Sequence, residues 1–383
     1  MFEYESDFIK KINYKTLRHA ADAEFNWSVS AIHYAFIELS DIDIKEYYTD
    51  AKAFTFACSK KNREKIQELF GTDVDVKPYA PAILYGHLSA LGFELVFPEG
   101  GEVFYKKRNM TLDESIRLFD RKPDYQREGY YPVYKKNLDR IQTLLPDDHD
   151  ALSMQYSTEG PTTLAYEILN QDVFYQPYDD PEKFKVLQKR IVESIVDFRR
   201  FQSAERGRIT KKTGSGLYDD IAAMFSPDLW DEFVLPYWDI YFNELCEKER
   251  FLHCEDMTVN HLAHLEKLGI TYYEPAISAK LNPIAIRNSV RMPFSWKLES
   301  FHYPDLSIQD VRDWVLKAAA DGASRVWTVI GANMMNEACA SKVKEFIRTV
   351  KEVESMIQRG VTRQEIGKMV SEAGRRKFWA KWP

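Results

Sequence analysis

The sequence predicts an α/β protein built as a (β/α)8 TIM barrel with an N-terminal helical extension. From about residue 80 onward, short apolar segments alternate with amphipathic helices, and sustained alternation of this kind indicates a parallel sheet. No nucleotide-binding glycine motif follows an expected strand. The pair Gly214 and Gly216 lacks the third glycine of a dinucleotide-binding turn, and there is no P-loop sequence. A closed barrel is therefore favoured over a doubly wound sheet.

Seven apolar segments are expected to be strands, and they span residues 82–85, 152–156, 217–218, 251–253, 271–273, 294–298 and 326–330. In a TIM barrel the functional side chains project from the carboxyl ends of the strands. Those ends carry an acid-rich set with a single histidine, namely Glu159, Asp219, Asp220, His253, Glu255, Glu274 and Asn333. A site with these residue types is typical of catalysis rather than of stability alone.

Five helices are expected at residues 180–198, 226–237, 258–269, 307–322 and 343–353. Pro181 suits the first turn of its helix, where a backbone N–H has no helical partner. Pro236 should kink the second helix because it lies in the interior. Thr258 is a candidate N-cap for the third helix, and Gly269 is its expected end.

The chain is expected to have three parts. Residues 1–75 are predicted to form a helical cap or dimer arm, which leaves a homodimer open. Residues 76–358 are predicted to form the catalytic barrel, and residues 359–383 a tail helix that folds back on it. Thr362 and Glu365 have the spacing of a capping box at the start of that tail.

Composition limits the classes of function. The chain has 383 residues, enough for one large barrel, and its net charge of −7 without a long basic run argues against a nucleic-acid partner. Its four cysteines are widely spaced, which is typical of a reducing compartment. No apolar run approaches the ~18 residues of a membrane span, and the N-terminus lacks a signal-peptide core. We therefore expect a cytoplasmic protein without a membrane partner.

The densest group of metal-capable side chains is the run His253-Cys254-Glu255-Asp256, where an apolar strand ends. Alternation along a strand places His253 and Glu255 on one face and Cys254 on the other. Two ligands on one face at this end of a strand suit a metal site with an open coordination position. The alternative is a buried polar turn that caps the next helix.

Three segments occur in order along the chain: Glu159-Gly160-Pro161-Thr162-Thr163-Leu164-Ala165 before Asp179-Asp180-Pro181-Glu182, then Asp219-Asp220-Ile221-Ala222 before Phe225-Ser226-Pro227, and finally His253 through Gly269. Together they resemble the uroporphyrinogen decarboxylase superfamily, which includes the corrinoid and coenzyme M methyltransferases. The resemblance covers roughly residues 80–350. It implies a TIM barrel.

Differences from the family's motifs indicate which branch of the superfamily this chain resembles. Uroporphyrinogen decarboxylases carry an N-terminal arginine-rich segment that grips the substrate carboxylates, whereas Arg18 is isolated in residues 1–80. The thiol-methylating enzymes use His-x-Cys and a distant Cys as zinc ligands, whereas this chain has His253-Cys254-Glu255. A His-x-Glu pair with a later cysteine is more similar to the O-demethylase methyltransferases. The resemblance thus implies zinc bound by His253, Glu255 and Cys339, although a small buried core residue is the alternative for Cys339.

The resemblance implies a zinc-dependent methyltransferase that cleaves a methyl ether, on a small methoxylated aromatic compound, and passes the methyl group to a corrinoid protein. Zinc would act as a Lewis acid on the leaving oxygen. The candidate proton donors are Glu159, Asp219, Asp220 and Glu274, and the candidate substrate-binding residues are Tyr156, Tyr272, Trp296, Trp327 and Asn333. The alternatives are a methylcobalamin:thiol methyltransferase, a decarboxylase, and an inactive barrel that binds a corrinoid or tetrapyrrole.

Overall fold

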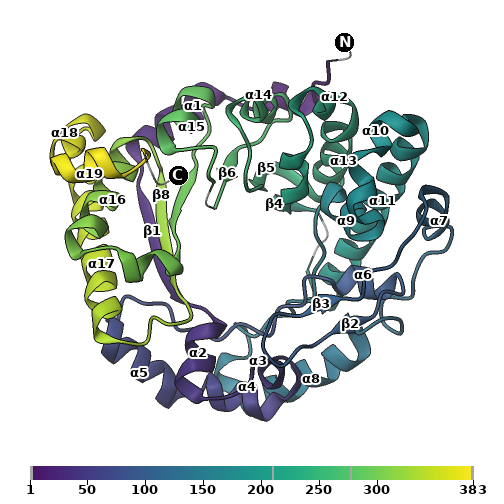
Figure 1. Ribbon diagram of the computed structural model, residues 1–383, viewed down its shortest axis with the longest axis horizontal. Coiled ribbons are helices and arrows are strands. Elements are labelled where there is room, and N and C mark those ends of the chain that lie inside the picture. The colour runs from purple at the N-terminus through teal and green to yellow at the C-terminus, as the bar shows by residue number, and fades with distance from the viewer. Residues whose placement is uncertain (1–2, 209–210, 277, 381–383) are drawn as a thin grey trace.

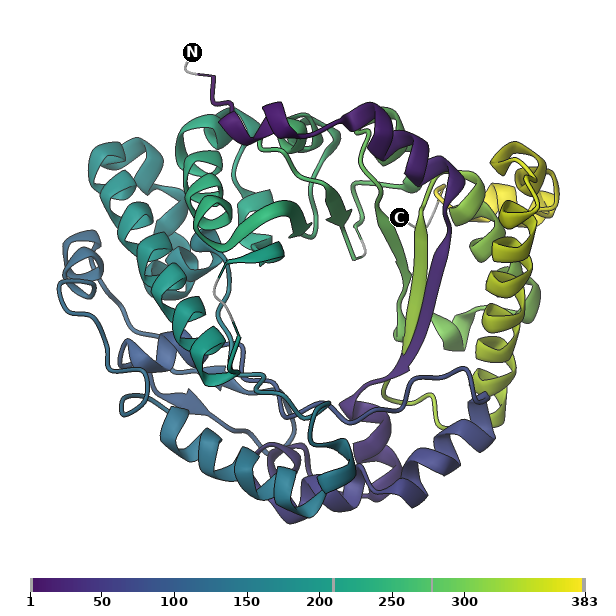
Figure 2. The same ribbon diagram turned by 180° about the vertical axis from the view of Figure 1, so that it is seen from behind.

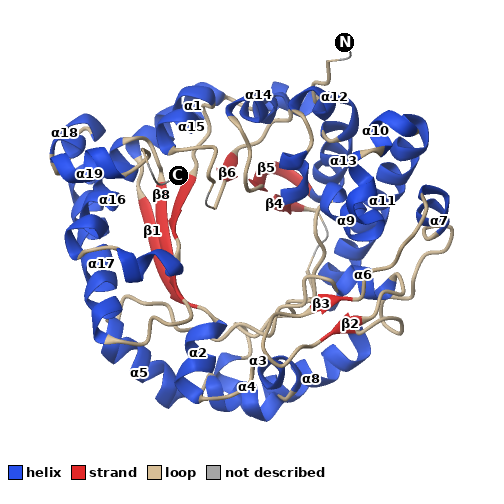
Figure 3. Ribbon diagram, viewed as in Figure 1, coloured by secondary structure: helices blue, strands red, loops and turns tan. Residues whose placement is uncertain are grey.

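The computed structural model describes residues 3–208, 211–276 and 278–380. Helices form the outside of a ring, and the strands of two parallel sheets line its inside (Figure 1; Figure 3). The strands of the described residues form three sheets. The first has the parallel order β1 (Asn26–Ala31), β8 (Arg325–Ile330), β7 (Ser295–Leu298), and the second the parallel order β4 (Lys212–Tyr218), β5 (Cys246–His253), β6 (Tyr272–Glu274). The third is an antiparallel pair, β2 (Leu95–Val96) and β3 (Phe104–Tyr105).

The two parallel sheets meet at one side of the ring. A parallel bridge between Tyr273 and Phe294 links the β6 side to the β7 side. The described strands nevertheless do not form a single closed hydrogen-bonded sheet.

On the opposite side, two irregular segments occupy the places of strands. Ser30 of β1 bridges Asp75, and Ile83 bridges Tyr156. The backbone N–H of Gly160 then donates to the carbonyl oxygen at the end of β4. The six parallel strands and the segments 75–83 and 152–160 therefore occupy eight positions around the ring, as in a (β/α)8 barrel.

The helices are, in chain order, α1 (Tyr14–Ala23), α2 (His33–Ser40), α3 (Ile44–Thr49), α4 (Ala51–Ala57), α5 (Lys60–Phe70), α6 (Gly86–Ala90), α7 (Leu112–Arg117), α8 (Tyr131–Leu144), α9 (Pro161–Leu169), α10 (Gln176–Asp179), α11 (Pro181–Glu205), α12 (Trp230–Phe233), α13 (Leu235–Leu245), α14 (Val259–Lys267), α15 (Pro283–Ser289), α16 (Ile308–Ala320), α17 (Glu337–Gln358), α18 (Arg363–Lys368) and α19 (Glu372–Lys377). No helix in the described part of the chain has both the length and the apolar character needed to cross a membrane.

Local signals in the sequence predicted several helix boundaries. Pro181 is the first residue of α11, and the predicted capping box of Thr362 and Glu365 begins α18. At Pro236 the predicted kink is a full break, because α12 ends at Phe233 and α13 begins at Leu235. A proline in the first turn of α13 is tolerated, whereas it could not continue α12.

The prediction of a helical extension over residues 1–75 is corrected at β1, which pairs along its whole length with β8. Figure 2 shows the two strands side by side although they lie at opposite ends of the chain. Val29 and Ala31 are buried while Ser30 between them is less so. Six residues of such alternation are too few to stand out in a helical, aromatic-rich segment. The domain boundaries at residues 75 and 358 stay predictions.

The C-terminal tail folds back on the barrel. The buried guanidinium group of Arg363 in α18 donates to the carbonyl oxygens of Ala323 and Ala21, at 2.9 and 2.7 Å. A single side chain thus joins the tail to the end of α16 and to α1. The hydrophobic core lies between strands and helices, where Leu217, Leu252 and Val326 are at most 1% exposed.

Candidate active site

Strand alternation turns one face of β4 and β5 toward the inside of the ring. Leu217 and Leu252 are paired and lie on the face covered by helices. Their neighbours Tyr218 and His253, also paired, therefore point to the inner face. The two rings lie 5.5 Å apart between centroids. His253 thus stands at the carboxyl end of β5, facing the inside of the barrel.

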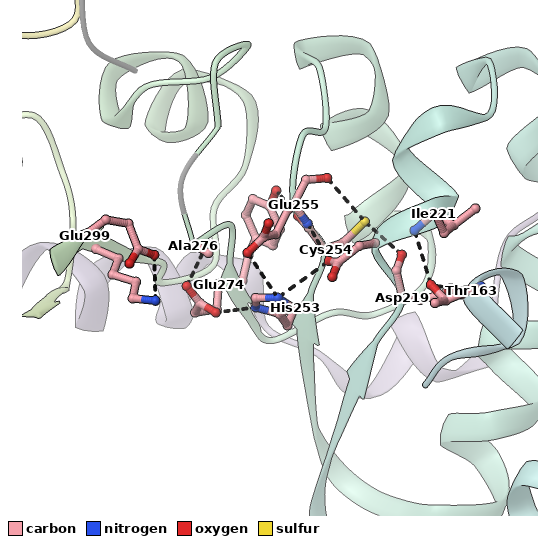
Figure 4. Close-up of polar contacts among 12 residues, drawn as sticks. Thr163, Asp219, Ile221, His253, Cys254, Glu255, Glu274, Ala276 and Glu299 are labelled. Atoms are coloured by element: carbon pink, nitrogen blue, oxygen red, sulfur yellow. Dashed lines mark hydrogen bonds and ion pairs between the residues drawn. The ribbon is translucent and has the colours of Figure 1, made fainter. Parts of the chain in front are cut away.

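The imidazole of His253 has carboxylates on both sides (Figure 4). Nδ1 makes a short hydrogen bond to Glu274 at the end of β6. Nε2 lies 3.5 Å from Oδ1 of Asp220 and 3.7 Å from Oε1 of Glu255. His253 and Glu255 therefore lie on the same side, as the alternation predicted. Three of the sequence-predicted acids gather around one ring.

Backbone groups hold two of these carboxylates in place. The backbone N–H of Ala276 donates to Oε1 of Glu274 over 2.6 Å, which leaves Oε2 for His253. The backbone N–H of Glu255 donates to Oδ1 of Asp220 over 2.8 Å. The turn after β5 thus fixes Asp220 relative to Glu255.

The site has a surplus of acid. Burial, together with the charges of Asp220 and Asp219, raises the pKa of Glu159 to about 7. Burial and the charge of Asp220 also raise the pKa of Glu255 to about 7. For His253, burial lowers the pKa, but the hydrogen bond to Glu274 and the surrounding carboxylates outweigh it, so that the net shift is upward. A bound cation would relieve this repulsion.

Asp219 has a structural role. It is fully buried and accepts hydrogen bonds from the N–H groups of Thr162 and Thr163, at 3.1 and 2.6 Å, in the first turn of α9. It also accepts from the hydroxyl of Thr163 at 2.9 Å and from the indole of Trp238 at 2.6 Å. With both oxygens occupied, Asp219 anchors α9 to β4 rather than facing a substrate.

The donor atoms around Nε2 of His253 fit zinc. Two ligands of tetrahedral zinc lie about 3.3 Å apart when the bonds are about 2.0–2.1 Å long. The 3.5 and 3.7 Å distances from Nε2 to Asp220 and Glu255 are close to that spacing. Glu274 on Nδ1 corresponds to a carboxylate–histidine–zinc arrangement. Across the described residues, no three metal-capable side chains already form a ready-made ligand set, so small side-chain movements would accompany binding.

The candidate ligand Cys339 and the neighbouring Cys254 are both buried in the packing. Cys254 is fully buried, and its thiol contacts the carbonyl oxygen of Asp219 at 3.2 Å. Cys339 is buried in the first turn of α17, where its backbone N–H is capped by Asn336 at 3.0 Å. The role of Cys339 as third ligand stays a prediction.

The predicted substrate-binding residues do not all face the inside of the barrel. Tyr272 and Trp327 are half-buried, and Tyr272 stacks on Phe251 with 5.4 Å between ring centroids. Tyr156 is fully buried, with its hydroxyl on Ser89 at 2.5 Å.

Trp296 packs against Trp379 of the C-terminal tail, 5.7 Å between ring centroids, and is 1% exposed. Asn333 is exposed in the loop after β8, where its backbone N–H donates to Glu38 at 2.7 Å. Tyr272 and Trp327 therefore remain candidates for substrate contact, whereas Tyr156 and Trp296 fill the core.

Sequence reasoning missed three residues near the site. Tyr218 ends β4, and Glu299 directly follows β7 and pairs with Lys297 at 2.6 Å. The rule that strand ends carry function could have found Tyr218 and Glu299, because the expected strands 217–218 and 294–298 end where β4 and β7 end. Lys297 lies over the ring of Trp327, 4.6 Å from its centroid, a contact with no sequence signal.

Eight strand positions around the ring, with titratable side chains at the carboxyl ends of the strands, correspond to the arrangement of a TIM barrel. Residues 46–287 match the family model described as uroporphyrinogen decarboxylase (URO-D). This match covers more than half of the chain, which therefore belongs to the uroporphyrinogen decarboxylase family.

A solved structure, a methyltransferase from Methanosarcina mazei, is similar to this chain with a TM-score of 0.60 and 14% sequence identity. The similarity covers 89% of this chain and 99% of that one. At this identity it shows a shared fold. No curated protein sequence matches the chain.

Proposed function

We propose that the protein is a zinc-dependent methyltransferase that cleaves the methyl ether of a methoxylated aromatic compound and passes the methyl group to a corrinoid protein. The observation that carries the proposal is the environment of His253. Its Nδ1 is occupied by Glu274, and its Nε2 faces Asp220 and Glu255. Membership of the uroporphyrinogen decarboxylase family and a fold shared with a methyltransferase support the same class.

The reaction makes two demands on the protein. The carbon–oxygen bond of the ether breaks, the methyl group leaves with the acceptor, and the oxygen keeps the bonding electrons. That oxygen therefore needs charge stabilisation and a proton before an alcohol or phenol can leave. An acid-rich site with one oriented histidine can meet both demands.

His253 and Glu255 would hold zinc, with Asp220 or Cys339 as the third protein ligand. When bound, zinc supplies a Lewis acid that stabilises negative charge on the ether oxygen. The chain's own contribution is orientation. With zinc bound, the hydrogen bond to Glu274 would hold the proton on Nδ1 of His253, so that Nε2, which faces Asp220 and Glu255, would be the ligating nitrogen.

Glu159 is the proposed proton donor. Its pKa is raised to about 7 by burial and by the charges of Asp220 and Asp219. A carboxyl group in this range holds its proton at neutral pH and can still give it up. Asp219 has both oxygens in hydrogen bonds, and Glu274 is bound to His253, so neither is free to act as the acid.

Aromatic side chains provide a surface for an arene. The rings of Tyr218, Phe251 and Tyr272 follow one another from His253, with centroid distances of 6.0 Å for the first pair and 5.4 Å for the second. Phe251 and Tyr272 also line an open cavity of about 680 Å³ that lies beside α1, toward the amino-terminal ends of the strands. This volume suits a small aromatic molecule.

The decarboxylase alternative lacks an N-terminal clamp for a polyanionic substrate. Residues 1–80 contain two arginines. Arg18 donates to the carbonyl oxygens of Arg287 and Val290, and Arg63 forms a bidentate pair with Asp148. Both guanidinium groups thus hold the fold together.

Elemental analysis of the purified protein tests the metal site first. We expect about one zinc per wild-type chain and strongly reduced zinc in His253→Ala and Glu255→Ala. His264→Ala is the matched control, because it removes another partly buried histidine that contacts a carboxylate, Asp231, at 3.2 Å. Equal zinc in wild type and His253→Ala would overturn the metal site.

Activity with a reduced corrinoid protein tests the reaction. Wild-type protein should release the phenol from a methoxyarene and methylate the corrinoid, whereas His253→Ala should do neither. Methyl transfer only from methylated corrinoid to a thiol would instead establish the thiol methyltransferase. A zinc-free wild-type protein that binds corrinoids would favour the inactive barrel.

A further inference from the structure

A second polar cavity, distinct from the acidic site, lies between β4 and α11. It has a volume of about 210 Å³, carries no acidic side chain in its lining, and is lined by Arg199, Gln202, Arg206, Lys212, Gly214 and Tyr218 among others. Three of these side chains are cationic. A cationic cavity is unexpected in a chain whose net charge is −7.

The cavity lies where segment 152–160 and β4, which occupy neighbouring strand positions in the ring, move apart. Segment 152–160 contacts β4 through the hydrogen bond from the N–H of Gly160 to Tyr218, 2.6 Å long. Further from that end, side chains of α11 take the place of a strand partner. Gln202 and Arg206 donate to the carbonyl oxygens of Tyr156 and Met154. The polar side chains of α11 thus reach into the barrel wall beside β4.

Two guanidinium groups that line this space have an unused donor. Within the described residues, Nε of Arg199 and Nε of Arg206 are buried and have no hydrogen-bond partner. Arg63 and Arg250 also have an unpaired Nε, but each forms an ion pair with a carboxylate. Among the ion pairs of the described chain, neither Arg199 nor Arg206 has such a partner. Buried donors of this kind commonly mark a bound water or ion.

Lys212 adds a third positive charge. Burial, followed by the charges of Arg206, Arg208 and Arg199, lowers its pKa. Its cationic form is therefore destabilised by its surroundings, and an anion would relieve the repulsion.

One nearby acidic group is occupied by other partners, because the carboxylate of Glu205 accepts hydrogen bonds from Tyr131 and Gln126. Glu249 lies beside Gly214 and also lines the cavity next to α1. Within the described residues none of the three cations forms an ion pair with a carboxylate, although the charge of Arg199 acts on Glu159 from a longer distance.

We propose that this cavity is an oxyanion-binding site that takes one carboxylate or phosphate group. Planar guanidinium groups and an ammonium group are the side chains that recognise such groups best. The volume fits a single anionic group and is too small for a tetrapyrrole.

Tyr218 connects the two sites. It lines the cationic cavity, and its ring lies 5.5 Å from His253. An anionic group bound here could belong to a substrate whose reacting part lies near His253, or it could be a free phosphate-type anion. The binding itself does not depend on the proposed methyl transfer.

Titration calorimetry of inorganic phosphate into the full-length protein at low ionic strength tests the site. We expect saturable binding to the wild type and at least about tenfold weaker binding to Lys212→Gln, because a charge-assisted contact is lost. Arg199→Gln should weaken binding in the same way. Its side chain has one described hydrogen bond, to Gln202 at 3.2 Å, so the fold should tolerate the change.

Lys211→Gln is the matched control, because Lys211 is the exposed neighbour of Lys212 and its loss changes net charge equally. It should bind phosphate as the wild type does. Absence of saturable binding to the wild type, or equal weakening in both lysine variants, would overturn the proposal.

Benzoate distinguishes the two sources of the anion. If benzoate displaces phosphate from the wild type, the site accepts a carboxylate-bearing substrate. If phosphate stays bound in excess benzoate, the site is specific for phosphate groups. The titrations are made on zinc-free protein, so a failure of the metal site leaves their result unaffected.

Discussion

Glu274 binds Nδ1 of His253 and so decides which nitrogen of the imidazole faces the other carboxylates. The same carboxylate is fixed through its second oxygen by the backbone of Ala276 at 2.6 Å. Histidine ligands of metals usually have such a partner, which sets the ring orientation and raises the basicity of the ligating nitrogen. Glu274 is therefore a positioning residue for the candidate zinc site.

Replacing Glu274 with Gln should weaken zinc binding about 10–100-fold while leaving the fold intact. The amide keeps the shape of the side chain but no longer stabilises positive charge on the imidazole. Competition with a chromophoric chelator measures the affinity. Glu299→Gln is the control, because Glu299 pairs with Lys297 at 2.6 Å near the same strand ends. Unchanged zinc affinity in Glu274→Gln would remove Glu274 from the site.

The proposed acid Glu159 predicts the pH dependence of turnover. Its pKa is raised to about 7, so the protonated form is lost as the pH rises through that value. The turnover number should fall above about pH 7, and Glu159→Gln should lower it about 10²-fold or more without this dependence. The pH profiles of the two proteins check the assignment. An alkaline limb that persists in Glu159→Gln would assign the acid elsewhere.

The same carboxyl group predicts how stability depends on pH. Its pKa is raised from 4.5 to about 7 on folding, so the folded protein holds the proton more tightly between these values. Stability from this group is present below about 4.5 and is lost as the pH rises through 7. Urea unfolding should therefore show Glu159→Gln gaining stability relative to wild type between pH 5 and pH 8. A difference that does not change over this range would contradict the shift.

Much of the fold was predictable because the strands are short apolar segments between well-marked helices. The segments around Leu252 and Val326 were placed correctly, since both are buried and flanked by turns. The segments 82–85 and 152–156 make only isolated bridges, at Ile83 and Tyr156. Segments with such irregular backbone show no periodic pattern of apolar residues, so the sequence does not reveal them.

The part of the site that depends on the alternation of side chains along a single strand was predictable from the sequence. His253 and Glu255 are two residues apart, so they lie on one side whatever the register of the sheet. Tyr156 and Trp296 were expected at the site, but each points to the opposite face of its strand position and fills the core. A shift of one residue exchanges the faces of a strand, and sequence alone does not fix that shift.

Asp219 should matter for stability rather than for chemistry. Asp219→Ala leaves the buried donors of Thr162, Thr163 and Trp238 without an acceptor, which should lower the free energy of unfolding by about 3 kcal/mol or more. Urea denaturation measures the loss. The exposed Asp228→Ala is the control and should stay within about 0.5 kcal/mol of wild type. A stable but inactive Asp219→Ala protein would restore a catalytic role.

Gly160 allows the close approach of α9 to β4. A methyl group at this position would stand 2.4 Å from Cβ of Asp219, so Gly160→Ala should cost about 2 kcal/mol through overpacking. Gly100→Ala is the control, because nothing lies within 4 Å of its added methyl group. Equal stability of the two variants by thermal unfolding would show that α9 can shift without cost.

The third zinc ligand can be assigned by comparing Cys339→Ala with Asp220→Asn. Oδ1 of Asp220 lies 3.5 Å from Nε2 of His253, whereas Cys339 is buried in the first turn of α17. If Asp220 is the ligand, Asp220→Asn should lower zinc affinity by at least about tenfold, and Cys339→Ala should not. Loss of a thiolate ligand also changes the spectrum of the cobalt-substituted protein, because sulfur-to-cobalt charge-transfer bands disappear.

The spectrum keeps this comparison independent of folding defects. A cobalt-substituted wild type without thiolate bands would exclude Cys339, whatever the stability of its variant. Thiolate bands that disappear in Cys339→Ala and persist in Asp220→Asn would establish Cys339, and α17 would then have to move toward His253 when the metal binds. In that case Asp220 would not ligate the metal and would contribute only its negative charge to the site. Its carboxylate already accepts a hydrogen bond from the backbone N–H of Glu255 at 2.8 Å.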